Sequence, residues 1–146
     1  MHRDRHFVSD DGHLAVTITA RSMATLVERC RRANDDETGG VLVGRYTDRG
    51  DRAVVSLTTG APKDSRAARW SFFRGIRGLQ AVIDRAWRRG EYYLGEWHYH
   101  PRASAQPSST DIQQMVAFAA DPAYRCPEPV LVVLGGDPNL DPTITV

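Results

Sequence analysis

The stretch from Tyr92 to His100 is the feature that most constrains how this chain can fold. It is rich in aromatic residues and is followed by Pro101, a pattern that predicts a β-strand. Side chains alternate between the two faces of a strand, so His98 and His100 share one face. Their Cα atoms would lie about 6.6–6.8 Å apart, which allows both imidazoles to bind one metal ion.

Asp111 can supply a third ligand. Pro107 to Asp111 has the composition of a helix N-terminus, and the turn that follows His100 is long enough to fold back. Two histidines and one carboxylate leave the fourth position of a tetrahedral zinc ion open to water, the arrangement of a catalytic site. Ser108 fits a helix cap, and it could also donate a hydrogen bond to an oxyanion.

A zinc-activated water needs a base, for which Glu37 is the first choice. Glu37 stands where a loop enters an apolar segment, and Gly39 and Gly40 beside it allow a close approach of the backbone. Glu96 shares the face of His98 and His100 by alternation, so it is either a rival base or a partner that orients an imidazole. The glycine context favours Glu37.

Predicted strands and helices alternate along the chain, which indicates an α/β (α+β) class with a mixed sheet packed by about three helices. A polar lead-in over residues 1–12 precedes one domain over residues 13–146. A helix over residues 21–32 buries Cys30 as a small core residue. A helix over residues 70–89 has apolar residues at helical spacing: Phe72, Ile76, Leu79, Ile83 and Trp87. The helix that begins near residue 108 has an apolar stripe: Ile112, Met115, Val116 and Ala119.

The composition narrows the class of protein. The 146 residues suit one domain, and a net charge of +1 argues against nucleic-acid binding as the main function. The absence of a long apolar stretch argues against a membrane span, and two cysteines are too few for a disulfide scaffold, so we expect a cytoplasmic protein.

Arginines gather around the predicted helix over residues 70–89, where they form a solvated face or a docking surface for an acidic partner: Arg66, Arg69, Arg74, Arg77, Arg85, Arg88 and Arg89.

These residues together resemble the signature of the JAMM/MPN (JAB) metalloprotease family. The pattern is His98-x-His100, seven residues, Ser108, two residues, Asp111, with Glu37 in an upstream Glu-x-Gly-Gly-x-Leu-x-Gly segment that ends at Gly44. The resemblance implies a cytidine-deaminase-like fold and one zinc ion per chain. His98, His100 and Asp111 would bind the zinc, Glu37 would act as general acid/base, and Ser108 would stabilise the tetrahedral intermediate.

The same resemblance implies an isopeptidase or peptidase that cleaves after the C-terminal tail of a ubiquitin-like protein, by deconjugation or precursor maturation. Tyr99 replaces the Ser or Thr that the family commonly has between the two histidines. Its side chain would point to the face opposite to His98 and His100, so the replacement casts little doubt on metal binding. The chain lacks room after Asp111 for the long insertion of eukaryotic deubiquitinases, so it looks more like compact bacterial relatives. Those relatives accompany E1-like and E2-like partners, and some act in antiphage defence.

Other functions also fit this sequence. The same site serves phage-tail assembly or sulfur-carrier processing in some relatives, and MPN scaffolds without catalysis also exist. A cytidine-deaminase zinc site is disfavoured because the chain has no Cys-x-x-Cys pair. A fourth ligand from Cys126 would close the site to water. A metal-binding lead-in built from His2, His6 and His13 is a weaker interpretation than a solvated segment.

Overall fold

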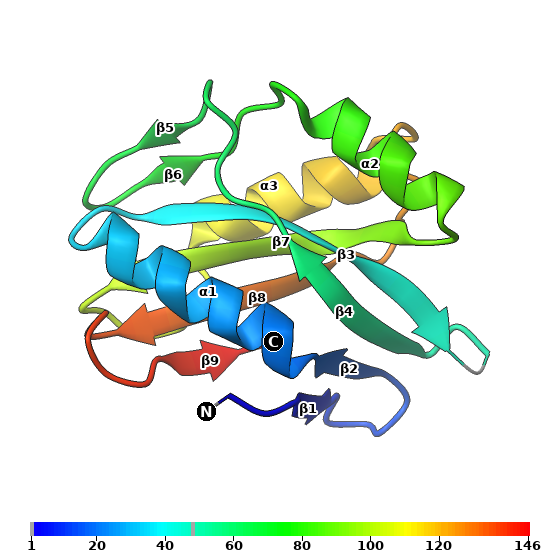
Figure 1. Cartoon of the computed structure of the whole chain (residues 1–146), viewed down its shortest axis with the longest axis horizontal. Coiled ribbons are helices and arrows are strands. Elements are labelled where there is room, and N and C mark those ends of the chain that lie inside the picture. The colour runs from blue at the N-terminus through cyan, green and yellow to red at the C-terminus, as the bar shows by residue number, and fades with distance from the viewer. Residues whose placement is uncertain (1, 48) are drawn as a thin grey trace.

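A computed structural model of the chain describes residues 2–47 and 49–146, and it confirms a mixed sheet packed by three helices (Figure 1). The main sheet has seven strands in the order β1-β2-β4-β3-β7-β8-β9, with β2–β4 and β7–β8 parallel and the other pairs antiparallel. Its strands are β1 (Arg5–Val8), β2 (Ala15–Ile18), β3 (Thr38–Thr47), β4 (Arg52–Thr58), β7 (Tyr92–Pro101), β8 (Val130–Gly136) and β9 (Thr143–Thr145). A separate hairpin joins β5 (Arg66–Ala67) to β6 (Phe72–Phe73).

Helix α1 (Ala20–Ala33) packs against one face of the sheet. It begins at Thr19, whose side chain accepts a hydrogen bond from the Ser22 amide, and its apolar residues recur every three to four positions. The sequence predicts this helix and its buried Cys30, and the structure confirms both. The resulting α1-side cluster has these members at its centre: Ile18, Met23, Leu26, Val27, Cys30, Leu42, Val55, Leu94, Trp97, Tyr99, Val132 and Leu134.

Helices α2 (Leu79–Arg88) and α3 (Ser109–Ala120) lie on the opposite face of the sheet. The strand residues that contact them alternate along each strand with the residues of the α1-side cluster. The α2-side cluster is smaller: Val41, Val43, Leu79, Ala86, Tyr93 and Cys126. Cys126 lies within it, and its thiol donates to the Leu94 carbonyl at 3.7 Å. This face therefore has room for polar side chains toward one end of β7.

A β-bulge changes the alternation along β7. The register between β3 and β7 shifts between Leu42 and Val43, where Gly95 pairs with Leu42 but Tyr93 pairs with Val43. Gly95 has a φ of +153°, and a Cβ there would collide with the Val130 backbone, so only glycine fits. The bulge places Tyr93 and Glu96 on the same face, although residues three apart in a regular strand lie on opposite faces.

The predicted helix over residues 70–89 is wrong in its first half, because α2 begins only at Leu79. Asp64 accepts hydrogen bonds from the backbone amides of Ile76 and Arg77 and so holds the preceding segment in a loop. Gly78 then caps α2 in the left-handed conformation, with a φ of +81°. Phe72 consequently belongs to strand β6, and Ile76 is 69% exposed instead of buried.

The apolar stripe predicted for α3 is wrong at two of its four positions, since Ile112 and Val116 are 52% and 65% exposed, whereas Met115 and Ala119 are partly buried. The buried residue of α3 is Asp111. The lead-in over residues 1–12 contains an unpredicted strand, β1, which pairs with β2; Met1 lies outside the described residues. Within the described residues no helix has the length and apolar character to cross a membrane.

Candidate functional site

The ends of β3 and β7 bring Glu37 beside the two histidines. The antiparallel register pairs Gly39 with His98 and Thr38 with Tyr99, so its continuation places Glu37 opposite His100. His98 and His100 lie on the face opposite to Trp97 and Tyr99, as the alternation predicts, and all four side chains are buried or nearly so.

Gly39 is required for this close approach. A Cβ on Gly39 would lie 2.9 Å from Cδ2 of His98 and 2.7 Å from the ring of Phe72, and it would also meet the Trp97 carbonyl. Phe72 itself packs edge-on against His98, with ring centroids 5.4 Å apart. The glycine therefore lets strand β3 and the β5–β6 hairpin close against the imidazole, as the sequence predicts for Gly39.

Asp111 joins both histidines. Nδ1 of His98 lies 2.8 Å from one carboxylate oxygen of Asp111, and Nε2 of His100 lies 3.0 Å from the other. Ser108 caps α3: its hydroxyl accepts from the Asp111 amide at 3.0 Å, and its own amide donates to the Asp111 carboxylate at 2.9 Å. The reciprocal capping box fixes the carboxylate at the first turn of α3, where it faces strand β7.

The ring nitrogens indicate which atoms are available to a ligand. Nδ1 of His100 contacts the Ser104 carbonyl at 3.3 Å, which leaves Nε2 as the nitrogen on the Asp111 side. When Nδ1 of His98 donates to Asp111, Nε2 keeps its lone pair. That Nε2 is buried and has no hydrogen-bond partner among the described residues. An unpaired buried nitrogen is costly, and it is a feature to be expected of a site that takes a ligand.

The donor set fits a zinc ion, although the side chains form a hydrogen-bonded cluster. No group of three or more His, Cys, Asp or Glu side chains within residues 2–47 and 49–146 already has the arrangement of a metal site. His98, His100 and Asp111 offer imidazole nitrogen and carboxylate oxygen, ligands that suit zinc. The protons shared between Asp111 and the imidazoles are those that metal binding would release.

The charges of the cluster are strongly coupled. Burial raises the pKa of Asp111, but hydrogen bonds from His100 and His98 outweigh burial and hold that pKa well below its usual range. The hydrogen bond to Asp111 raises the pKa of His100. Burial raises the pKa of Glu37; the charge of Asp111 adds to this rise, and His100 and His98 oppose it. Glu37 is half-buried, so it keeps access to solvent.

Glu96 occupies a separate buried network behind the histidines. Its carboxylate is ion-paired with Arg74 and accepts a hydrogen bond from the Tyr93 hydroxyl, and its side chain is fully buried. Arg74 also donates to the Tyr124 hydroxyl at 2.7 Å and lies 4.5 Å from the centre of the Phe118 ring. Arg74 is therefore not part of a solvated arginine face, and this pairing favours a structural role for Glu96 over that of a base.

Sequence reasoning missed three groups around the cluster. Phe72 was expected on a helix, so its contact with His98 was not foreseen. Arg74 was placed with the exposed arginines, and no sequence signal distinguishes it from them. The Ser104 carbonyl is a backbone group, which a residue pattern cannot identify.

Comparisons with known proteins agree with the fold and with the family that the sequence resembles. Residues 19–143 match the family described as prokaryotic homologues of the JAB domain. Over 136 residues the chain is 40% identical to a protein of Enterobacter hormaechei named "CD-NTase/cGAS isopeptidase". This match covers 93% of this chain and 76% of that protein. It is 33% identical over 118 residues to "Probable metalloprotease y4qB" of Sinorhizobium fredii, across 78% of this chain and 71% of that protein.

A solution structure of a protein from Desulfitobacterium hafniense supports the fold alone. It superimposes with a TM-score of 0.66 and 23% identity, and the match covers 88% of this chain and 80% of that one. The family match extends over most of the chain and includes all five candidate site residues: Glu37, His98, His100, Ser108 and Asp111. The chain belongs to the prokaryotic JAB-domain family.

Proposed function

We propose that this chain is a zinc-dependent isopeptidase that cleaves a conjugate containing a CD-NTase. The observation that carries the proposal is the cluster of His98, His100 and Asp111 beside Glu37, in a chain 40% identical to a relative named as an isopeptidase of this kind. The resemblance to the JAMM/MPN family implies a second kind of substrate. In this substrate a ubiquitin-like protein is joined to its target through its C-terminal tail. E1-like and E2-like proteins are the partners expected to form such conjugates.

His98, His100 and Asp111 would hold one zinc ion per chain, which when bound supplies a Lewis acid for the scissile carbonyl and lowers the pKa of water. The chain fixes these ligands from rigid elements: two come from the same face of β7, and the third comes from the capped first turn of α3. The contact of His100 with the Ser104 carbonyl orients the ring so that Nε2 faces Asp111.

Glu37 is proposed as the general acid/base. Its carboxylate would accept a proton from the attacking water and deliver it to the amine nitrogen that leaves. Such a group must release the proton that it has accepted, which requires a pKa closer to neutrality than that of an exposed glutamate. Burial raises the pKa of Glu37 in this direction.

Ser108 is proposed as the donor that stabilises the developing oxyanion. Its oxygen accepts the Asp111 amide hydrogen, and its own hydroxyl hydrogen is free to rotate toward a substrate carbonyl. Ser108 is exposed at the start of α3, where a substrate can reach it. The capping role and the catalytic role are therefore compatible.

The compartment proposed for this reaction is the cytoplasm. The two cysteines, Cys30 and Cys126, are both free and buried. Burial raises the pKa of Cys30 to about 12, so this thiol is inert and serves packing. Free cysteines are typical of a reducing compartment.

Glu37→Gln tests the proposed function. The substrates are two reporters, one with a CD-NTase and one with a ubiquitin-like protein, each joined through its C-terminal carboxyl to a lysine of a fluorescent peptide. We expect the wild type to cleave one of them and the variant to lose at least about a hundredfold in rate. Zinc content, measured by plasma mass spectrometry, should stay unchanged.

The matched control is Glu28→Gln, which removes an exposed carboxylate on α1 that pairs with Arg32 at 2.9 Å. This variant should cleave at the wild-type rate. Cleavage by Glu37→Gln at the wild-type rate would contradict the role of Glu37. Cleavage of neither reporter by zinc-loaded wild type, with intact zinc content, would contradict the proposed substrate and favour a different JAB substrate or a scaffold.

A further inference from the structure

The two outer strands of the sheet, β1 and β9, face each other across a groove. Within the part of the chain that the structure describes, β1 pairs with β2 and β9 pairs with β8, and neither has a second neighbour; Figure 1 shows both at the same side of the sheet. The directions of the successive pairings make β1 and β9 parallel to each other. The curled sheet thus stops short of closing, and two open strand edges remain.

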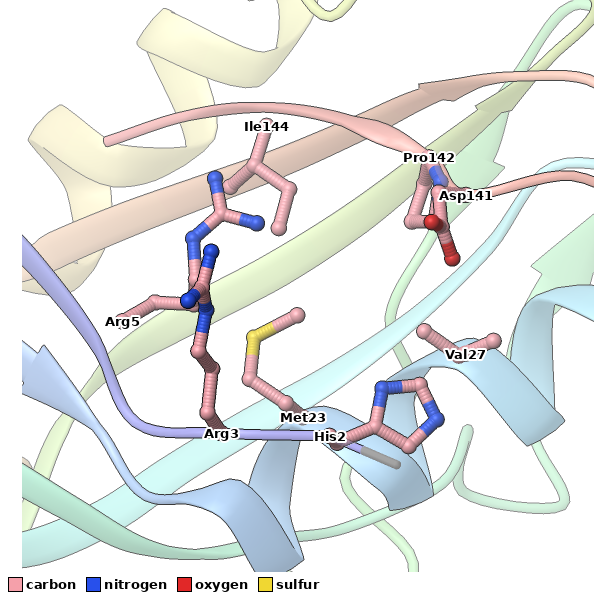
Figure 2. A pocket seen from close by; sticks show the side chains of 8 residues that line it. All are labelled: His2, Arg3, Arg5, Met23, Val27, Asp141, Pro142 and Ile144. Atoms are coloured by element: carbon pink, nitrogen blue, oxygen red, sulfur yellow. The ribbon is translucent and has the colours of Figure 1, made fainter.

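The groove is hollow at both ends. A cavity of about 370 Å³ is lined by residues of β1, α1 and β9 and of the segments just before the two strands: His2, Arg3, Arg5, Met23, Val27, Asp141, Pro142 and Ile144. Figure 2 shows Arg3 and Arg5 on one wall, Met23 and Val27 on the helix that forms the floor, and Asp141 with Pro142 on the opposite wall. Farther along, Phe7 and Val8 of β1 and Val146, which follows β9, are among the residues that line a second cavity of about 680 Å³.

The two cavities differ in chemistry. The first carries the guanidinium groups of Arg3 and Arg5 against one carboxylate, that of Asp141, and neither arginine has an ion pair within the described part of the chain. The second is largely apolar, with Leu14 and Val16 among its lining residues. The groove is therefore basic at one end and apolar at the other.

The backbone of β1 offers hydrogen bonds to an occupant. The Ser9 amide donates to the Leu14 carbonyl at 2.9 Å, and residues of an antiparallel ladder alternate between facing the partner strand and facing away. The register therefore directs the backbone groups of His6 and Val8 away from β2, toward the groove. From Arg3 to Val8 the groove spans about 17 Å of extended chain, which matches a strand of about five or six residues.

We propose that this groove binds an extended segment of a partner protein, with acidic side chains at the Arg3 and Arg5 end and β-branched apolar side chains along the rest. The segment adds a strand beside β1 and fills the open side of the sheet. Arg3 and Arg5 select the acidic end, and Phe7, Val16 and Val146 receive the apolar end. Neither cavity is lined by His98, His100 or Asp111, so this site is separate from the proposed catalytic site.

The test measures binding of two fluorescein-labelled peptides, Asp-Glu-Val-Thr-Val-Thr and the reversed Thr-Val-Thr-Val-Glu-Asp, to the full chain by fluorescence anisotropy. We expect one orientation to bind with 1:1 stoichiometry, and its counterpart with lysines in place of the acidic residues to bind at least about tenfold more weakly. The double variant Arg3→Glu/Arg5→Glu should weaken the acidic peptide by at least about tenfold. Arg85→Glu/Arg88→Glu makes the same charge change on exposed positions of α2 and should change affinity by less than about twofold.

Val8→Pro tests strand addition separately from charge. It removes an amide that faces the groove but keeps the β1–β2 hydrogen bonds, and proline is tolerated on an edge strand. With circular dichroism unchanged, affinity for the acidic peptide should fall at least about fivefold. The proposal is overturned by absent binding at about 1 mM peptide, by equal weakening in the α2 control, or by a chain that dimerises through β1 in sedimentation and excludes the peptide.

Discussion

Strand β7 builds two different environments from consecutive residues. Trp97 and Tyr99 point into the α1-side cluster, where both are fully buried among apolar side chains. His98 and His100 point to the opposite face, where each is held by a polar partner, Asp111. One face of the strand is stabilised by area removed from water, and the other depends on specific pairs of polar atoms.

The difference shows how a small fold can carry a costly site. The polar face buries two imidazoles and two carboxylates, and Glu96 needs Arg74 and Tyr93 to offset its desolvation. The apolar face contributes the free energy of folding that offsets the cost of burying these polar groups. We therefore expect substitutions on the α1 side to unfold the chain, and substitutions on the site side to alter ligand binding more than folding.

Trp97→Ala should give the largest loss of stability. It removes the largest side chain of the α1-side cluster and the hydrogen bond from the indole to the Thr59 carbonyl, which is 2.8 Å long. The free energy of unfolding, measured by urea denaturation in EDTA, should fall by about 3–5 kcal/mol.

His98→Ala, at the next residue but on the other face, is the matched comparison. In EDTA it should cost about 1–3 kcal/mol, since it removes one hydrogen bond to Asp111 and a buried nitrogen that already lacks a partner. An equal loss for both variants would show that the two faces do not differ as described.

Arg74→Met tests the network behind the histidines. It leaves the buried Glu96 carboxylate with Tyr93 as its remaining partner among those described, so the free energy of unfolding at pH 8 should fall by about 3 kcal/mol. The double variant Arg74→Met/Glu96→Leu replaces the pair by apolar side chains and should recover most of the loss. A single variant as stable as the wild type would refute the view that Arg74 neutralises Glu96.

The pH dependence of the metal-free chain gives a smaller effect. Because the pKa of His100 is raised in the folded state, its contribution is complete below the unfolded value of about 6.5 and is lost as the pH rises through the folded value. Because the pKa of Asp111 is lowered, its contribution is present above about 3.9 and is lost as the pH falls. The pair therefore stabilises the fold most between about pH 4 and 6.5.

The corresponding measurement is the difference in Tm between wild type and Asp111→Asn in EDTA. This difference should be greatest near pH 5 and should shrink by about 2–4 °C above pH 7. A difference that grows as the pH rises above 7 would contradict the assigned pairing of His100 with Asp111.

The sequence was most informative where the pattern is local. Alternation along β7 predicts that His98 and His100 share a face, and the sequence around Ser108 predicts the start of α3; the structure confirms both. The glycine pair near the start of β3 predicts a close backbone approach, and Gly39 makes that approach at His98. These features depend on a few neighbouring residues and on backbone geometry.

The features that could not be predicted depend on contacts between distant segments. The spacing of apolar residues over 70–89 fits a helix, but Asp64 holds the first half in a loop and Gly78 starts α2 only afterwards. Arg74 resembles its exposed neighbours in sequence, and only the fold places it against Glu96. The exposed apolar side chains of α3 likewise show that helical spacing alone does not determine which face is covered.

The zinc content of the purified chain tests the central claim most directly. Plasma mass spectrometry of wild type, His98→Ala and the control His6→Ala, which alters an exposed histidine of β1 that bonds to Thr17, should give about one, none and about one zinc per chain. The account predicts that zinc is lost only with His98. No zinc in the wild type after zinc supplementation, or full retention in His98→Ala, would contradict it.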